Sequence, residues 1–295
     1  KGPERIKAGT IAHLCRTYVT SDHHKAKAQS SRERERRTLR RIENIHGHRR
    51  YAGLRTHHIE VDLEDFKPHA ANERLKLWRA ILGFAKDRNL IDADPSRDVK
   101  PRKTPKTDGH TPWSLSDIDQ FRDAYPIGSL EREAMEVLYW SGARVSDART
   151  FGATALGDGW LSFEQQKTRG ECLIPISVFA GDLDNWTPQM EQDRSLMLEA
   201  LGTNINRPVW LLRHYGGPGS GKGFSQWFSK VAGRAELKGR TAHGLRKSRC
   251  IALAEAGYNV LQLRSWVGHE DLESLDVYVR KANKKRLLLS KKSHG

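Results

Sequence analysis

Four short segments of this chain carry side chains suited to chemistry on a phosphate group. The segments are 141–147 with Arg144, 165–168 with Lys167, 242–248 with His243 and Arg246, and 267–278 with His269 and Tyr278. Guanidinium groups bind phosphate oxygens through charge-assisted and often bidentate hydrogen bonds. Because the transition state of a phosphodiester gathers extra negative charge, two fixed guanidiniums would stabilise it. The pattern therefore predicts nucleophilic attack on a phosphodiester.

Tyr278 is the candidate nucleophile in this set. A phenol has an unperturbed pKa near 10, so it needs a base or strong positive surroundings when it attacks. His243 is the candidate base, Lys167 the candidate acid for the leaving 5′ oxygen, and His269 would orient the phosphate or support Tyr278. A phosphotyrosine ester conserves the bond energy, so a 5′ hydroxyl could reverse the step. We therefore expect no cofactor, with neither ATP nor a metal ion.

Each of these signals has an ordinary structural explanation when taken alone. An arginine after a glycine is usually a surface residue, and a lysine in a hairpin is usually solvated. A His-x-x-Arg pair, such as His243 and Arg246, is most often structural, and a tyrosine near a C-terminus usually packs. The order and spacing of the segments favour the chemical interpretation, because His243 and Arg246 share one helical face and Tyr278 follows His269 by nine residues.

These motifs resemble those of the tyrosine recombinases, the family that includes the phage integrases. The resemblance runs from about residue 10 to residue 280, and the His243–Lys247 segment and the spacing from Gly268-His269 to Tyr278 are its most specific parts. It implies that a C-terminal domain is catalytic and that a helical N-terminal domain completes a C-shaped clamp around duplex DNA. It assigns the catalytic roles to Arg144, Lys167, His243, Arg246, His269 and Tyr278. Asp147 stands where a glutamate is commoner in the family.

The elements that would position these residues follow from hydrophobic periodicity and turn residues. The pattern predicts helices at 10–21, 30–45, 71–86, 116–125, 130–141, 144–151, 224–235, 243–256, 260–267 and 272–279, with a connector at 57–66. It predicts strands at 160–166 and 171–176 joined by a turn at 168–170, and a third strand at 209–212. The expected fold is mainly α with a small antiparallel β-sheet (α+β).

We expect two domains and two connecting segments. Residues 1–94 would form the helical, SAM-like core DNA-binding domain, and residues 113–283 the catalytic domain. Residues 95–112 hold Pro95, Pro101, Pro105 and Pro112 among lysines and arginines, which is typical of a basic linker without regular structure. Residues 284–295 would form a basic tail with a short helix, acting in its own subunit or exchanged in trans.

The charge favours a polyanionic partner. The formal net charge is +15, and residues 1–110 hold 26 Lys and Arg against 15 Asp and Glu. Such a balance fits double-stranded DNA better than a membrane, and no apolar run approaches the roughly 20 residues of a membrane span. The candidate DNA-binding residues are Arg32, Arg36, Arg40, Lys100, Arg102 and Lys103. The three cysteines lie far apart without a CxxC pair, which fits neither a disulfide framework nor a zinc site and suits the cytoplasm.

Three other features compete with this interpretation. Residues 216–222 imitate a phosphate-binding loop, but glycine stands at 223 where a magnesium-holding Ser or Thr belongs. The pairs His23-His24 and His57-His58 are sequence neighbours, which do not share a helical face, so we do not expect them to ligate a metal. Tyr258 follows Gly257 at a helix boundary, and we expect it to pack or cap rather than attack.

The expected function is site-specific recombination of mobile or prophage DNA through a 3′-phosphotyrosyl intermediate. Four subunits on two duplexes would carry it out, with a monomer when DNA is absent. Two alternatives stay open: a type IB topoisomerase, which uses similar chemistry alone, and a non-catalytic DNA-binding protein with a decayed site.

Overall fold

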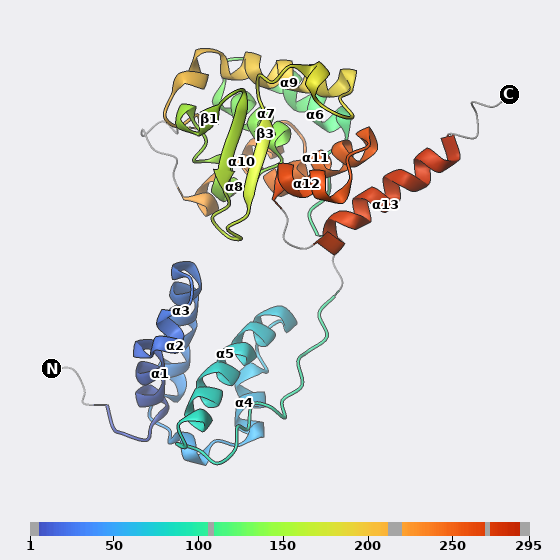
Figure 1. Cartoon of the computed structure of the whole chain (residues 1–295). Coiled ribbons are helices and arrows are strands. Elements are labelled where there is room, and N and C mark those ends of the chain that lie inside the picture. Colours follow the sequence, from blue (N-terminus) through green and yellow to red (C-terminus); the bar gives the residue numbers. More distant parts are fainter. Residues whose placement is uncertain (1–5, 106–108, 212–219, 269–271, 290–295) are drawn as a thin grey trace. The chain divides into compact units, whose positions relative to one another are not determined.

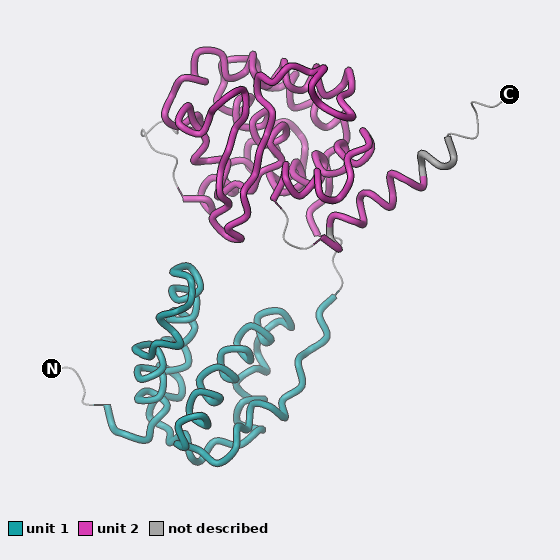
Figure 2. The backbone as a smooth tube through the Cα atoms, viewed as in Figure 1, with its two compact units in different colours: residues 1–107 teal, residues 108–295 magenta. Residues whose placement is uncertain are grey.

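The computed structural model describes residues 6–105, 109–211, 220–268 and 272–289. The chain divides into two compact units, unit 1 with residues 1–107 and unit 2 with residues 108–295 (Figure 2). In the part of the chain that is described, no helix is long and apolar enough to cross a membrane.

Unit 1 is helical. Its elements are α1 (Ile11–Thr20), α2 (Asp22–Lys25), α3 (Gln29–His46), the 3-10 helix η1 (Tyr51–Gly53), α4 (Thr56–Leu63) and α5 (Pro68–Asp87) (Figure 1). Thr10 begins α1 as its N-cap, because its side chain accepts from the backbone N–H of His13. The apolar faces of α1, α3, α4 and α5 meet in one core, in which Tyr18, Ile42 and Ile81 are fully buried.

A buried carboxylate ties three helices of unit 1 together. Asp62 on α4 accepts hydrogen bonds of 2.6 Å from Nε and Nη2 of Arg74 on α5 and one of 2.7 Å from Nε1 of Trp78. His46, the last residue of α3, lies 2.6 Å from the same carboxylate through Nε2. Although burial opposes ionisation, these partners hold the pKa of Asp62 below its usual value. The charge is therefore paired inside the unit.

The segment that follows α5 lacks regular structure over residues 95–105, as predicted, but it is attached to unit 1. Arg79 donates to the carbonyls of Ser96 and Val99 at 3.3 and 2.8 Å, and Asn72 exchanges two 2.8 Å hydrogen bonds with the backbone of Arg102. Two residues of this predicted linker, Ser96 and Val99, are nevertheless buried, at 0 % and 4 % exposed.

Unit 2 combines helices with a three-stranded sheet. Its helices are α6 (Leu115–Ala124), α7 (Leu130–Ser141), α8 (Val145–Ala148), α9 (Pro188–Leu201), α10 (Gly221–Arg234), α11 (Ala242–Ala256), α12 (Val260–Val267) and α13 (Leu272–Leu289), with 3-10 turns η2 (Ala153–Ala155), η3 (Ala180–Asp182) and η4 (Gly202–Asn206). Its strands are β1 (Leu156–Gly157), β2 (Trp160–Glu164) and β3 (Glu171–Pro175). The sheet is antiparallel in the order β1-β2-β3, and Phe163 pairs with Cys172.

The core of unit 2 lies between the sheet and the central helices α7 and α11. Trp140 on α7 is 1 % exposed and donates from Nε1 to the carbonyl of Pro175 on β3 at 2.9 Å. Arg249 on α11 is 0 % exposed, donates to the carbonyl of Trp140 at 3.0 Å and lies 4.0 Å from the centre of that indole ring. This buried arginine therefore links α11 to α7 beside the residues that carry the predicted chemistry.

The predicted fold class is confirmed, since the chain is mostly helical with a small antiparallel sheet. Several element predictions are wrong. The expected connector at 57–66 is helix α4, and helix α9 was not predicted. Residues 209–211 form no strand, so the third strand is β1 instead. Helix α6 begins at Leu115 with Ser114 as its N-cap, instead of at residue 116.

The helix predicted at 144–151 is the single turn α8, whose N-cap is Arg144. The tail is not a separate helix, because α13 continues from Leu272 through Leu289, and Figure 1 shows it running outward from the rest of its unit. The predicted boundary between the catalytic domain and the tail, at 283/284, therefore falls inside one helix.

Candidate active site

Arg144 is placed by the sharp turn that ends α7. Gly142 has φ of 57°, the left-handed conformation that ends helices, and Arg144 two residues later is extended and precedes α8. Its Nη1 donates to Oε1 of Gln165 at 2.7 Å and lies 3.5 Å from the carbonyl of Gly268. The guanidinium is thus held by residues from the β2–β3 turn and from the end of α12.

Arg246 lies on the first turn of α11 and is 3 % exposed. One terminal nitrogen, Nη1, donates to the carbonyls of Gly142 at 2.7 Å and Val267 at 2.8 Å. The other, Nη2, is buried and has no hydrogen-bond partner among the described residues. A buried donor without a partner costs stability, so its presence points to an acceptor that arrives with a ligand.

The two arginines share one electrostatic environment. Desolvation is the largest influence that lowers the pKa of Arg246, and the nearby charge of Arg144 lowers it further. Asp147 is the nearby carboxylate, 1 % exposed, and its Oδ1 accepts from the backbone N–H of Gln166 at 3.1 Å. Two guanidiniums with one carboxylate leave an excess positive charge that an anion would balance.

Gln165 joins the pieces of this arrangement. It is 0 % exposed, and while its Oε1 accepts from Arg144 and from the hydroxyl of Thr168, its Nε2 donates to the carbonyl of Val267 at 2.8 Å. Arg246 donates to that same carbonyl. The C-terminal end of α12 is therefore the point to which the β2–β3 turn and both arginines are fixed.

Gly268 makes this convergence possible, and we expect Gly268→Ala to destabilise the fold by roughly 2–4 kcal/mol. Its φ is 62°, and a Cβ there would stand 2.3 Å from Sγ of Cys172 and 2.3 Å from Nε2 of Gln165. Urea denaturation of the variant measures the loss. Gly233→Ala on α10, where a Cβ would meet nothing within 4 Å, is the matched control, and an equal effect at both positions would contradict this account.

His243 stands beside the arginines at the start of α11. It is exposed, and its ring centre lies 4.7 Å from that of His110, whose Nδ1 is 3.0 Å from Oγ1 of Thr241, the N-cap of the helix. Desolvation, followed by the charges of His110, Arg246, Lys247 and Arg144, lowers the pKa of His243 to about 4. At neutral pH the imidazole is therefore uncharged and able to accept a proton, and its exposed side is open to a substrate.

The lowered pKa of His243 predicts an unusual pH profile for DNA cleavage. Because kcat/KM reports the ionisation of the free enzyme, its acid limb should fall near pH 4 instead of the ordinary histidine value of about 6.5. Activity should therefore stay flat from pH 8 to 6 and be lost only as pH falls through the pKa of His243. Single-turnover cleavage across this range measures the profile.

His110→Gln provides the second arm of this test. The change removes one positive neighbour of His243, so the acid limb should move upward toward 6.5. An acid limb at pH 6.5 in the unsubstituted protein would rule out His243 as the titrating base. An acid limb at the same pH in His110→Gln and in the unsubstituted protein would do so as well.

Tyr278 lies on α13, which packs against α11 and α12. Its ring is half-buried against the core of unit 2. Desolvation is the main cause that raises the pKa of Tyr278, and Cys250 adds to it, while Arg246 lowers it. The phenol is thus protonated in the free protein and lies within electrostatic reach of Arg246.

Lys167 and His269 are less firmly placed. Lys167 is exposed in the turn between β2 and β3, two residues from Gln165, and none of its side-chain contacts fix it to the arginines in the described structure. His269 lies outside the described residues. The structure therefore brings Arg144, His243, Arg246 and Tyr278 into one electrostatic neighbourhood, with Lys167 on the adjoining turn.

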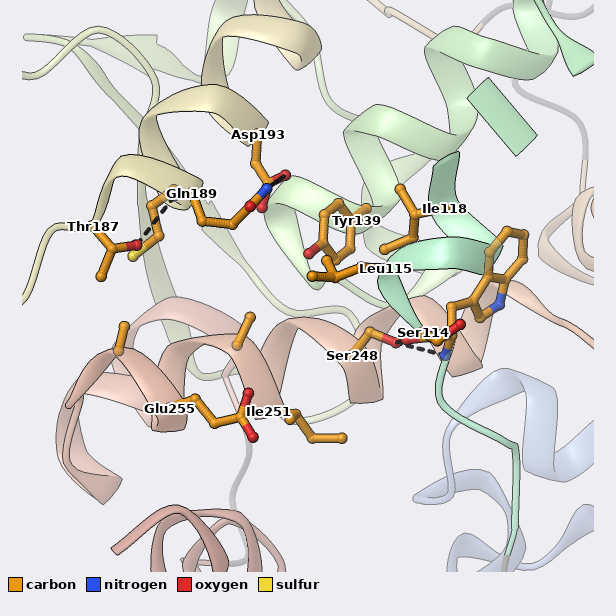
Figure 3. A pocket seen from close by; sticks show the side chains of 14 residues that line it. Ser114, Leu115, Ile118, Tyr139, Thr187, Gln189, Asp193, Ser248, Ile251 and Glu255 are labelled. Carbon is orange, nitrogen blue, oxygen red and sulfur yellow. Dashed lines mark hydrogen bonds between the residues drawn. The ribbon is translucent and has the colours of Figure 1, made fainter. Parts of the chain in front are cut away.

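The competing features resolve differently. Tyr258 is 7 % exposed and its ring packs edge-on against Trp266 at 6.0 Å, so the prediction that it packs is confirmed. The phosphate-loop imitation lies partly outside the described residues, and Ser220 simply caps α10. A cavity of about 450 Å³ between α6, α9 and α11 is lined by Ile118, Tyr139, Met190 and Ile251 and includes none of the predicted catalytic residues (Figure 3).

Comparison with known proteins decides the family. The model of the "Phage integrase family" matches residues 115–285, more than half of the chain. The chain belongs to the phage integrase family. It is therefore a tyrosine recombinase and an enzyme of DNA strand transfer, as the sequence motifs predicted.

Curated relatives and solved structures of this family agree. The chain is 24 % identical to "Tyrosine recombinase XerC" of Pelotomaculum thermopropionicum, over 75 % of this chain and 73 % of the relative. It is 24 % identical to "Tyrosine recombinase XerD" of Ralstonia nicotianae, over 78 % and 75 %. A lambda integrase dimer bound to a COC′ core site matches with a TM-score of 0.73 at 18 % identity, over 92 % of this chain and 77 % of the other. A lambda integrase tetramer bound to a Holliday junction matches with a TM-score of 0.71 at 19 % identity, over 89 % and 78 %.

Two contributors to the integrase site escaped the sequence reasoning. Gln165 lies in the same segment as Lys167, but only the fold reveals that its amide links Arg144 to the end of α12. His110 stood in the proline-rich segment, far in sequence from His243. The spacing of the family's motifs identifies the charged residues of the site, but it does not identify Gln165 or His110.

Proposed function

We propose that this recombinase cleaves one DNA strand at a time with Tyr278 and rejoins it to a new partner. The observation that carries the proposal is the buried, unpaired Nη2 of Arg246, beside Arg144 and within electrostatic reach of Tyr278. A scissile phosphate in this neighbourhood would satisfy the free guanidinium nitrogen and balance the excess charge. Donors that are already fixed in this way need no reorganisation when charge develops.

The proposed reaction exchanges one phosphate ester for another. The phenolic oxygen of Tyr278 attacks phosphorus, its proton passes to neutral His243, and the bond from phosphorus to the 5′ oxygen breaks. Lys167 protonates that leaving oxygen, and the 3′ phosphate remains as an ester on Tyr278. A 5′ hydroxyl from the partner strand then reverses these steps. His269 would hold the phosphate or support Tyr278.

Lys167 suits the role of a mobile acid. It is exposed on the β2–β3 turn, whereas Gln165 at the base of that turn is buried and fixed to α12. A lysine with a free side chain on an anchored turn can approach the leaving oxygen once DNA is bound. Residues 95–112 as a linker and residues 1–94 as a DNA-binding domain remain part of the proposal.

The proposed partner is double-stranded DNA, with four subunits on two duplexes during exchange and a monomer without DNA. The matched lambda integrase structures, a dimer on a core site and a tetramer on a Holliday junction, support this assembly. The tail of residues 284–295 is proposed to pass to a neighbouring subunit, and the outward course of α13 in Figure 1 supports that role. Because the matched relatives are bacterial, we propose the bacterial cytoplasm as the site of action.

Unit 1 supplies the proposed non-specific DNA contacts. Arg32, Arg36 and Arg40 follow one another at four-residue intervals on α3 and so share a face. Lys100 and Lys103 are exposed. The guanidinium of Arg102 already donates to the carbonyl of Phe66 at 2.8 Å, so its assignment to DNA has the least support of the group.

The salt dependence of DNA binding tests these contacts. Each phosphate contact contributes a slope of about −0.9 to the plot of log affinity against log salt. Replacing Arg32, Arg36 and Arg40 together with glutamine should therefore flatten the slope by roughly 3. The comparison variant is Arg37→Gln/Arg41→Gln, on an adjoining part of the same helix. A slope unchanged by the triple substitution would show that this face does not touch DNA.

A duplex that carries a nick near the scissile phosphate tests the function itself. Cleavage releases a short fragment that diffuses away, so the covalent complex is trapped and can be counted on a denaturing gel. Strand exchange between two duplexes identifies a recombinase, whereas relaxation of one supercoiled circle without exchange would identify a topoisomerase. The absence of any adduct on the element's own ends would leave a DNA-binding protein with a decayed site.

A further inference from the structure

A second concentration of positive charge lies in unit 1, whereas the residues assigned to catalysis belong to unit 2. Residues 44–59 include three arginines and four histidines and no acidic residue. The structure folds this run around a pocket of about 730 Å³ between the end of α3, η1 and the start of α4. Its wall includes His46, Arg49, Arg50, His57 and His58.

The backbone of this run is held in place while two of its arginine side chains stay free. The N–H of Ile11 donates to the carbonyl of Arg49 at 2.9 Å, and Thr10 forms a β-bridge with Arg50. Both side chains are exposed, and neither has a carboxylate partner within the described structure. A fixed backbone that carries unpaired guanidiniums is suited to bind an anion.

The histidines also present donors to this pocket. Nδ1 of His58 accepts from the backbone N–H of Arg55 at 3.1 Å, so the ring proton of the neutral form must sit on Nε2. The Nε2 of His46 donates to Asp62, whose charge is already shared with Arg74 and Trp78. That carboxylate is therefore satisfied inside unit 1 and does not neutralise the pocket.

The imidazoles of His57 and His58 lie together, with ring centres 3.9 Å apart. Desolvation, followed by the charges of His57, Arg49, Arg55 and His46, lowers the pKa of His58. An anion in the pocket would reverse the influence of these charges and favour the protonated form. The pocket also lies at the N-terminus of the eight-residue helix α4, where the helix dipole favours negative charge.

We propose that this pocket binds a phosphate group and takes up a proton on His58 as it does so. The ligand is either a phosphate of a nucleic-acid backbone or a small phosphorylated molecule. Both present the negatively charged oxygens of a tetrahedral phosphate group to the arginines. A metal ion fits poorly, since in the described part of the chain no three His, Cys, Asp or Glu side chains are grouped to hold one. The site is independent of the strand-transfer residues, which all belong to unit 2.

Calorimetric titration of the full chain with pyrophosphate, at pH 6 and pH 8, tests the proposal. Binding should be tighter at pH 6, by up to about tenfold per pH unit for each proton taken up. Arg49→Gln/Arg50→Gln should abolish binding, whereas Arg37→Gln/Arg41→Gln, an equal charge change on the exposed surface of α3, should preserve it. His58→Gln should keep binding at pH 8 and reduce its dependence on pH.

Duplex DNA binding by the same variants distinguishes the two sources of phosphate. If Arg49→Gln/Arg50→Gln also flattens the salt slope by roughly 2, the phosphate belongs to a nucleic-acid backbone. If it removes pyrophosphate binding alone, the ligand is a small phosphorylated molecule. Pyrophosphate binding that survives in Arg49→Gln/Arg50→Gln, or that falls equally in Arg37→Gln/Arg41→Gln, overturns the proposal. At protein concentrations that saturate the DNA, covalent capture should be intact in every one of these variants, which separates this site from the catalytic one.

Discussion

Tyr278→Phe is expected to abolish covalent capture of nicked DNA while leaving non-covalent DNA binding unchanged. The substitution removes the one oxygen that is proposed to bond to phosphorus. Phenylalanine keeps the ring that packs half-buried against the core of unit 2, so the helix α13 should remain in place. Denaturing gels count the adduct, and gel-shift titration measures the affinity for DNA.

Tyr258→Phe is the matched control for this experiment. It deletes the same hydroxyl from a tyrosine nearby in sequence, but Tyr258 is 7 % exposed and packs against Trp266. The control protein should therefore form the adduct at the normal rate. An adduct that persists in Tyr278→Phe and disappears in Tyr258→Phe would identify Tyr258, in the loop between α11 and α12, as the nucleophile and contradict this account.

Arg144→Gln is expected to slow cleavage by about a hundred- to a thousandfold. The guanidinium is held by Gln165 and faces the same region as Arg246, so its loss removes charge stabilisation from the transition state. Since the side chain is only half-buried and makes one short hydrogen bond, the fold should tolerate glutamine. Single-turnover cleavage at saturating protein separates this effect from weaker DNA binding.

Arg169→Gln, on the β2–β3 turn whose Gln165 holds Arg144, controls for the loss of a positive charge. Arg169 is 80 % exposed at its side chain and pairs with Glu164 across the turn, so it should not contact the scissile phosphate. Cleavage by this variant should stay within about twofold of normal. Equal losses at both positions would mean that Arg144 contributes general electrostatics and no specific contact with the transition state.

Much of the site could be predicted from sequence because its charged residues occur in fixed motifs. The turn at Gly142 places Arg144, and the three-residue spacing places His243 and Arg246 on one turn of α11. The helix at 260–267 was predicted to the residue, since its apolar period and its glycine end are both strong signals. Local chemistry of this type is visible in the sequence without knowledge of the fold.

The remaining features depend on contacts between distant segments. Helix α4 contains two adjacent histidines and an aspartate, so its sequence favours a connector, and it is stabilised through the contacts of Asp62 with α3 and α5. Helix α9 is nearly uniform in polarity, and it was missed because packing on α7 holds it in place. No sequence pattern indicates that Arg249 is buried, yet it lies in the core, where the carbonyl of Trp140 and the carboxylate of Asp193 accept its hydrogen bonds.

The structure also differs from the prediction for the C-terminal tail. Its basic residues and leucines predict a short separate helix. However, nothing in the sequence between Tyr278 and residue 289 ends a helix. Neither glycine nor proline interrupts α13, so one continuous helix carries both the proposed nucleophile and the start of the tail. Movement of that helix would therefore alter Tyr278 and the tail together.

Peptide mapping of the trapped DNA adduct is the most direct measurement of the central claim. Trypsin separates the two candidate tyrosines, because Tyr278 falls in the peptide of residues 265–280 and Tyr258 in that of residues 250–264. After nuclease digestion, mass spectrometry should find the nucleotide remnant on the 265–280 peptide and assign it to Tyr278. A remnant on any other peptide would contradict the account, because Arg144, His243 and Arg246 would then surround a phenol that does no chemistry.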